Sequence, residues 1–126
     1  MRLERVSLDD KFAKFSETWK PKIVGELNDF HVKLVRIEGD FLWHHHEVED
    51  ELFIVLEGAI EMHYRDPEDG MERVERFGPG EFLIVPRGVE HKPVAPVPTK
   101  MMLLEPKTTV NTGTARSERT AFPEWI

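Results

Sequence analysis

Three histidines and a glutamate stand at spacings that suit a metal site. His44 and His46 lie two positions apart, and four residues separate His46 from Glu51. Side chains two apart in a β-strand point to the same face, so His44 and His46 can lie side by side. Glu51 opens the next strand-like segment, and a hairpin would place its carboxylate opposite the two imidazoles. This mixture of ligands suits divalent iron, manganese, cobalt, nickel, copper or zinc.

The three consecutive histidines leave two registers open. If His45 faced inward, it would share its face with Glu47, and the site would offer only one imidazole and one carboxylate. We favour the register with His44 and His46 inward, because it sets two imidazoles beside Glu51. Asp50 is the alternative ligand if the strand that follows it is shifted by one residue.

His91 is the fourth candidate ligand. An apolar segment ends in the turn Pro86-Arg87-Gly88, and His91 stands near the start of the strand that follows. It faces inward if the alternation continues after that turn. The chain contains no cysteine, so a bound metal has to be held by imidazole and carboxylate groups. Because imidazole binds a metal only when it is neutral, we expect the metal affinity to fall below roughly pH 6.

Further side chains are candidates for a binding pocket. Arg87, Arg36 and Lys33 could each pair with an anionic group of a substrate. His63 is expected to line the pocket or to form a cross-strand pair, whereas His31 is expected to be structural. Apolar candidates for the pocket or the core are Phe53, Phe82 and Met102.

The apolar pattern predicts an all-β protein with a short N-terminal helix. Ser7 can cap a helix, and Leu8, Phe12 and Phe15 recur at helical spacing as far as about Phe15. From Ile23 onward apolar residues alternate, and Gly, Pro, Asn and Asp mark short turns. We predict strands at 23–27, 30–37, 41–46, 52–56, 59–65, 71–76, 82–85, 91–94 and 100–105. Because no helix separates them, these strands should form an antiparallel sandwich or barrel.

Length and charge narrow the remaining classes of protein. The 126 residues fit one domain, with a helix and lead-in at 1–22, a barrel at 23–106 and a surface tail at 107–126. The aromatic end of this tail could dock on the barrel or on a neighbouring subunit. The net charge of −7 argues against a nucleic-acid partner, which usually meets a basic face. No apolar stretch approaches the roughly 18 residues of a membrane span, and the charged N-terminus is unlike a signal peptide. We therefore expect no membrane partner and a cytoplasmic location.

Two segments resemble the motifs of the cupin family, G-x₅-H-x-H-x₃₋₄-E-x₆-G and G-x₅-P-x-G-x₂-H-x₃-N. The first motif is matched, with four residues rather than five before the first histidine, by Gly39, His44, His46, Glu51 and Gly58. The second is matched at the family's spacing by Gly80, Pro86, Gly88 and His91. Ala95 replaces the final Asn, and 21 residues separate the motifs. The chain is similar to small stand-alone cupins grouped with mannose-6-phosphate-isomerase-like proteins.

The resemblance implies a double-stranded β-helix, or jelly-roll barrel, that forms a homodimer. It also implies one iron, manganese, zinc, nickel or copper ion in the barrel beside a small-molecule ligand, with the metal ligands His44, His46, Glu51 and His91. Such a protein would be a metal-dependent isomerase, lyase or dioxygenase acting on a small polar metabolite or sugar. The alternative is a non-catalytic cupin that binds a small molecule or sugar, and a weaker option is an accessory protein stabilised by its metal.

Overall fold

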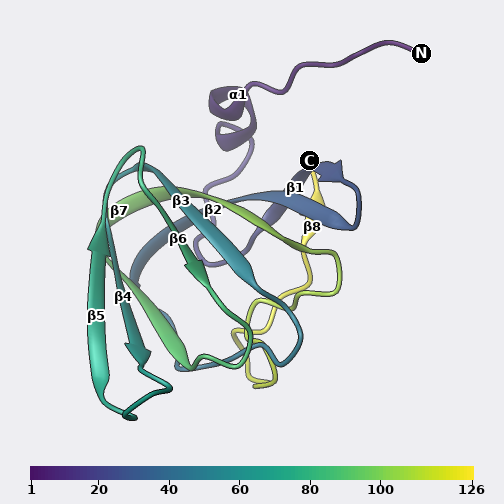
Figure 1. Cartoon of the computed structure of the whole chain (residues 1–126). Coiled ribbons are helices and arrows are strands. Elements are labelled where there is room, and N and C mark those ends of the chain that lie inside the picture. The colour runs from purple at the N-terminus through teal and green to yellow at the C-terminus, as the bar shows by residue number, and fades with distance from the viewer.

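The structure, a computed structural model of residues 1–126, is a nearly all-β barrel with one short helix near the N-terminus (Figure 1). Its elements are α1 (Leu8–Phe12), β1 (Lys22–Leu27), β2 (Phe30–Asp40), β3 (Glu51–Glu57), β4 (Ile60–Arg65), β5 (Glu72–Phe77), β6 (Phe82–Val85), β7 (His91–Pro106) and β8 (Glu124–Trp125). The strands follow the order β5-β4-β7-β2-β1-β8, and β3 pairs with both β7 and β6. The predicted all-β, double-stranded β-helix fold is confirmed.

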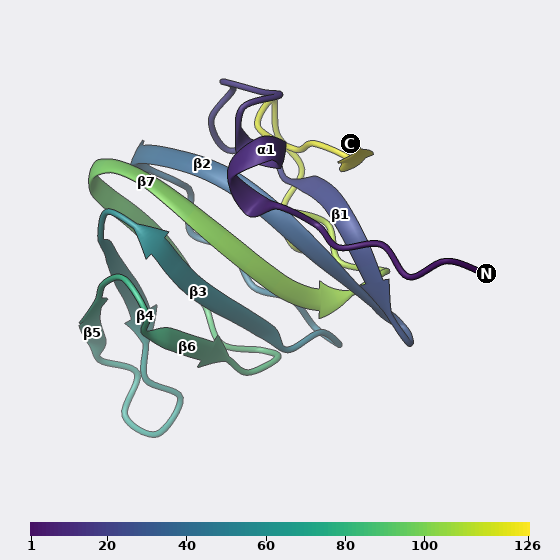
Figure 2. The same ribbon diagram turned by 90° about the horizontal axis from the view of Figure 1, so that it is seen from above.

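Strand β7 belongs to both walls of the barrel, which Figure 2 shows from above. It runs antiparallel to β2, while its first residues pair with β4 and its later residues pair with β3. Pro96 and Pro98 are exposed at the bend between these two parts. The prediction of two separate strands at 91–94 and 100–105 was wrong. Proline has no N–H to donate to a neighbouring strand, but an exposed bend needs no such donor, so β7 continues through Pro96 and Pro98.

The predicted strand at 41–46 is not a regular strand. Its one bridge joins His44 to His91, whose backbone N–H groups each donate to the other's carbonyl oxygen at 3.0 and 2.9 Å. The Phe41 N–H also donates to the Pro93 carbonyl oxygen at 3.0 Å, so the segment follows the start of β7 as far as His44 without forming a continuous ladder. The alternation of side chains nevertheless persists, because His44 and His46 are buried whereas His45 is only half-buried.

Helix α1 packs on the outer face of β1 and β2. The Ser7 side chain caps it by accepting a hydrogen bond from the Asp10 N–H at 3.2 Å, as predicted. The helix ends at Phe12 rather than near Phe15, because the Arg36 guanidinium donates to the carbonyl oxygens of both residues. Phe12 and Phe15 then bury their rings in a small outer cluster that includes Leu34.

The main core lies inside the barrel and follows the strand alternation. In β3 the predicted inner residues Glu51, Phe53 and Val55 are buried, and the residues between them are partly exposed. The inner cluster comprises Val35, Ile37, Phe53, Val55, Ile60, Met62, Phe77, Val85, Ala95, Met101 and Leu103. The chain has no helix with the length and apolar character that a membrane span requires.

The C-terminal segment docks on the barrel, which is one of the two positions expected for its aromatic end. Its strand β8 runs parallel to β1, which corrects the expectation of antiparallel pairing throughout. The Ile126 N–H also donates to the Ile23 carbonyl oxygen at 3.1 Å. Nearer the histidines, the Thr114 N–H donates to the His45 carbonyl oxygen at 3.1 Å. The C-terminal segment is therefore hydrogen-bonded both to β1 and to the segment that carries the histidines.

Candidate metal centre

The four predicted ligands meet inside the barrel. Each offers one ligand atom, and these atoms lie within 4.8 Å of one another. Ligands on opposite sides of a transition-metal ion stand about 4 Å apart, since each bond is about 2 Å long. The cluster is therefore close to the size of one coordination sphere. All four side chains are buried, namely those of His44, His46, Glu51 and His91.

Backbone carbonyl groups orient two of the imidazoles. His44 Nδ1 lies 2.9 Å from the Leu42 carbonyl oxygen, and His91 Nδ1 lies 2.9 Å from that of Val89. A carbonyl oxygen only accepts, so Nδ1 carries the proton in both rings and Nε2 keeps its lone pair. This arrangement is the usual outer support of a metal-binding histidine.

The inner atoms of the cluster lack hydrogen-bond partners. Glu51 Oε1 lies 2.8 Å from His46 Nε2 and 3.4 Å from His91 Nε2. None of these three buried atoms has a hydrogen bond within the protein. Unpaired buried polar atoms are costly and need an explanation. A shared cation would satisfy all three, so the donor set fits a bound metal.

The electrostatics of the cluster favour neutral imidazole beside an ionised carboxylate. Burial, with the neighbouring His91, lowers the pKa of His44 to about 3. Burial alone would raise the pKa of Glu51, but the neighbouring Glu105, His46 and His91 outweigh it and leave that pKa well below the usual value. Burial and the adjacent Glu51 raise the pKa of Glu105 well above its usual value. Glu51 is therefore the carboxylate available to an ion.

Two crossing loops fix the ligands relative to each other. The Arg87 N–H donates to Asp50 Oδ1 at 2.8 Å, and the Arg87 guanidinium contacts both carboxylate oxygens of Asp50. The Gly88 N–H donates to the His46 carbonyl oxygen at 2.7 Å. The loop before His91 is thus tied to the loop between His46 and Glu51. Asp50, the alternative ligand, lies outside the cluster, and its pKa is lowered by the hydrogen bond from the Arg87 N–H.

The predicted anion-binding side chains serve structural roles instead. Lys33 is buried and its Nζ donates to Glu105 Oε1 at 2.7 Å, while Arg36 supports the end of α1. Arg87 pairs with Asp50. None of the three basic residues lines the cavity beside the cluster. The structure therefore places none of these candidates where it could pair with an anion in this cavity.

The remaining pocket candidates divide between cavity and surface. Phe53 lines the cavity, whereas Met102 packs against the outer cluster and Phe82 is exposed. His63 lies opposite Lys92 and Val74, next to the inward-facing Met62, so it is a cross-strand residue and not a cavity residue. His31 meets the edge of the Trp125 ring at a centroid distance of 5.7 Å, which agrees with a structural role.

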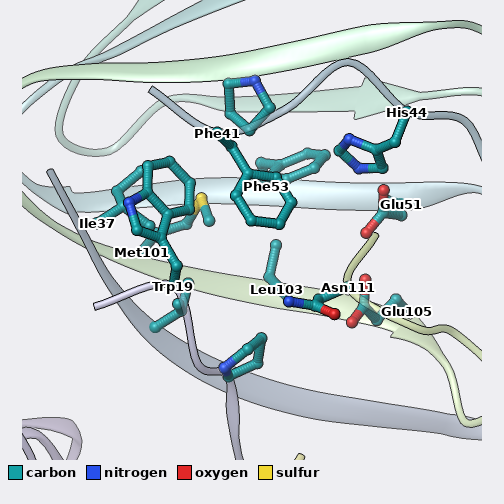
Figure 3. A pocket seen from close by; sticks show the side chains of 13 residues that line it. Trp19, Ile37, Phe41, His44, Glu51, Phe53, Met101, Leu103, Glu105 and Asn111 are labelled. Carbon is teal, nitrogen blue, oxygen red and sulfur yellow. The ribbon is translucent and has the colours of Figure 1, made fainter. Parts of the chain in front are cut away.

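A small cavity of about 40 Å³, partly open to solvent, reaches the cluster from one side. His44 and Glu51 line it, whereas His46 and His91 lie behind them. Figure 3 shows His44, Glu51 and Glu105 together at one end and Trp19, Ile37 and Met101 at the other. The remaining walls are also largely apolar. A molecule in the cavity would therefore meet a bound ion across the His44 and Glu51 side.

Sequence reasoning missed three residues of this site. Glu105 continues the inward positions of Met101 and Leu103 in β7, and a lone acid in that series was a signal that alternation could have revealed. Trp19 has a positive φ of 63° and stacks on Phe41 at a centroid distance of 4.9 Å. Asn111 reaches the cavity from the C-terminal segment. Neither Trp19 nor Asn111 belongs to the strand pattern, so no periodicity pointed to them.

Residues 32–106 match the protein family described as Cupin domain. The chain is 34% identical over 98 residues to the uncharacterized protein YdbB of Bacillus subtilis (strain 168). This match covers 78% of this chain and 76% of YdbB. It is also similar to the crystal structure of a cupin-2 domain containing protein from Shewanella frigidimarina NCIMB 400. That match has 40% identity and a TM-score of 0.74, and it covers 80% of this chain and 93% of the other.

A more distant likeness concerns the fold alone. The structure of hydroquinone 1,2-dioxygenase PnpCD in complex with Fe3+ has a TM-score of 0.73 at 20% identity, covering 84% of this chain and 33% of that one. Another structure of the same enzyme holds Cd2+ and 4-hydroxybenzonitrile. The family match spans more than half of the chain and includes all four residues of the buried cluster. The chain belongs to the cupin family.

Proposed function

We propose that this cupin binds one divalent transition metal through His44, His46, Glu51 and His91 and acts as an enzyme on a small molecule. The observation that carries the proposal is the set of unpaired ligand atoms converging inside the barrel. Three neutral imidazoles and one carboxylate give a divalent ion a net charge of +1. Iron, manganese, zinc, nickel and copper all suit this ligand set.

The position of the cavity supports catalysis rather than a purely structural metal. A structural site is usually closed, whereas a catalytic site keeps a side open to substrate or water. Here the cavity meets the cluster at His44 and Glu51. When bound there, the metal would polarise a substrate oxygen, lower the pKa of bound water or, as iron, bind dioxygen. The walls of the cavity are largely apolar, and Glu105 lines the same end of the cavity as Glu51.

The reaction class that we propose is that of an isomerase, a lyase or a dioxygenase. The iron-bound hydroquinone 1,2-dioxygenase of similar fold is the reason to include dioxygen chemistry in a screen. The alternative is a non-catalytic cupin that binds a small molecule. One observation favours that alternative, because Glu105 is the one acid or base lining the cavity apart from the ligands themselves. The subgroup with mannose-6-phosphate-isomerase-like proteins stays a prediction.

Metal analysis tests the ligand set directly. The protein is purified without chelators, and its metal content is measured by mass spectrometry for the wild type and single-residue variants. His44→Ala and His91→Ala should each lose the metal, because each removes a buried ligand. His45→Ala is the matched control and should keep the metal, since His45 faces away from the cluster. Loss of the metal in His45→Ala alone would show that the other register is the true one.

Turnover separates the enzyme from the binder. The metal-loaded protein is screened with keto acids, diols and phenols, with and without dioxygen, and product is followed by mass spectrometry. Product formation that disappears in His44→Ala supports the enzyme. A molecule that raises the melting temperature of the loaded protein without being converted supports the binder.

A further inference from the structure

The walls of the cavity argue for an apolar ligand body. Six apolar side chains of β2, β3, β7 and Phe41 line it, and they are Val35, Ile37, Phe41, Phe53, Met101 and Leu103. A sugar carries a hydroxyl on almost every carbon, and each hydroxyl that loses water needs a hydrogen-bond partner. These six side chains offer no such partner. An aromatic or aliphatic body gains free energy in the same place by leaving water.

The cavity also lacks a partner for an anionic group. No lysine, arginine or free amide lines it. Asn111 Nδ2 donates to the Arg119 carbonyl oxygen at 2.9 Å, and Asn111 Oδ1 accepts from the Ala121 N–H at 2.8 Å. Its amide is therefore occupied in holding the C-terminal segment. A phosphate or carboxylate far from the metal end would be buried without compensation.

The polar end of the cavity holds one acceptor that the protein leaves unused. Glu105 is 2% exposed, and its Oε1 accepts the hydrogen bond from Lys33. Its Oε2 is buried without a hydrogen-bond partner. Lys33 thus fixes the carboxyl group while leaving the second oxygen available at the same end as His44 and Glu51 (Figure 3). A ligand hydroxyl would satisfy this oxygen.

We propose that the cavity binds a small uncharged molecule with an apolar body between Phe41, Phe53 and Met101, and with one or two adjacent hydroxyls at the end that meets the metal position and Glu105. This inference rests on the proposed metal site, and it replaces the expectation of a sugar by a phenol-like or diol-like class. The distinguishing feature is that polar groups are confined to one end of the cavity.

Calorimetric titration of the Zn2+-loaded wild type tests the ligand class, and Zn2+ avoids oxidative turnover. The probes are catechol, 3,4-dihydroxybenzoate, D-glucose and D-glucose 6-phosphate, and the metal content is measured on the same sample. Catechol should bind at least tenfold more tightly than 3,4-dihydroxybenzoate, whose carboxylate would enter the apolar end. The two sugars should give no binding at millimolar concentration. A sugar that binds as tightly as catechol would overturn the proposal.

A variant tests the part assigned to Glu105. Glu105→Gln preserves shape but replaces one oxygen by an amide donor, so catechol should bind at least tenfold more weakly while the metal content stays unchanged. Glu90→Gln is the matched control, because Glu90 pairs with Arg65 away from the cavity. Loss of the metal in Glu105→Gln would show that Glu105 acts only through Glu51 and would overturn its contact with the ligand.

The wild-type titrations keep the two proposals distinguishable. If the wild type holds the metal but binds neither catechol nor 3,4-dihydroxybenzoate, the ligand class is wrong and the proposed metal site stands. If the wild type takes up no metal, both proposals fail.

Discussion

At the scale of single residues, burial changes the acid–base behaviour of His44. Its pKa is lowered to about 3, against 6.5 for an unperturbed imidazole. Between these values the unfolded chain binds a proton at His44 and the folded chain does not. This lower pKa weakens the competition of protons with a metal for the His44 ring, and the expected fall of metal affinity below roughly pH 6 stays a prediction.

The same shift predicts how the stability of the metal-free protein depends on pH. Because the unfolded state takes up the proton, the His44 contribution makes the unfolding free energy fall as pH drops from 6.5 toward 3, by up to about 1.4 kcal/mol per pH unit. Urea denaturation between pH 4 and 7 measures it. His44→Gln should have a shallower slope than the wild type, whereas His45→Gln should keep the wild-type slope. Equal slopes in all three proteins would contradict the lowered pKa.

Variants of Asp50 and Glu51 test which of these two neighbouring acids binds the metal. It was the alternative ligand, yet it lies outside the cluster and accepts hydrogen bonds from Arg87. Asp50→Asn keeps an oxygen for the Arg87 N–H and removes the charge, so metal content should not change. Glu51→Gln, which removes the charge of the proposed ligand, should lower the metal affinity by tenfold or more. Titration with a metal-sensitive dye measures both affinities, and loss of metal from Asp50→Asn would favour the shifted register.

At the scale of elements, the sequence motif predicted the members of the buried cluster better than it predicted the strands around them. The alternation in β3 placed Glu51 correctly, because residues within one strand have fixed relative directions. The hairpin expected between 41–46 and β3 is absent, since β3 pairs with β6 and β7. Lys33 and Glu105 could not be paired from sequence, because their contact depends on the long-range register of β2 and β7. Local patterns determine which face a side chain occupies but not which strand lies beside it.

The segment after β7 supports the histidines through a close backbone approach at Gly113. A Cβ added there would lie 2.0 Å from the His45 carbonyl oxygen, and Gly113 has a φ of +60°. Gly113→Ala should therefore lower the unfolding free energy by about 2 kcal/mol more than Gly70→Ala and should also weaken metal binding. Gly70 is the matched control, because its φ is +72° and an added Cβ there would meet nothing within 4 Å. Denaturant unfolding and metal titration of both variants provide the comparison, and equal losses in the two variants would mean that the close approach does not matter.

At the scale of the whole molecule, the outer face of the β6-β3-β7-β2 sheet carries two apolar rows. Cross-strand pairing aligns one row as Ile84, Leu52, Leu104 and Val32, and the other as Phe82, Ile54, Met102 and Leu34. Phe12 and Phe15 cover the Leu34 and Met102 end of these rows. The opposite end stays open, where Phe82 and Ile84 are 61% and 52% exposed. Sequence alternation showed that these residues face outward, but not that they would form one surface.

This open apolar end is where we expect a second copy of the chain to bind, which would make the protein a homodimer. A continuous exposed apolar patch usually marks an interface, and two copies related by a twofold axis would cover each other's patch. The wild type should then have about twice the mass of the 14.7 kDa chain in light scattering coupled to size-exclusion chromatography. Phe82→Glu should give the monomer mass, because it places two charges in the interface. Phe122→Glu is the control and should stay dimeric, because Phe122 is 74% exposed on the C-terminal segment, outside the two rows. A monomeric wild type, or dissociation by Phe122→Glu but not by Phe82→Glu, would show that the sheet face is not the interface.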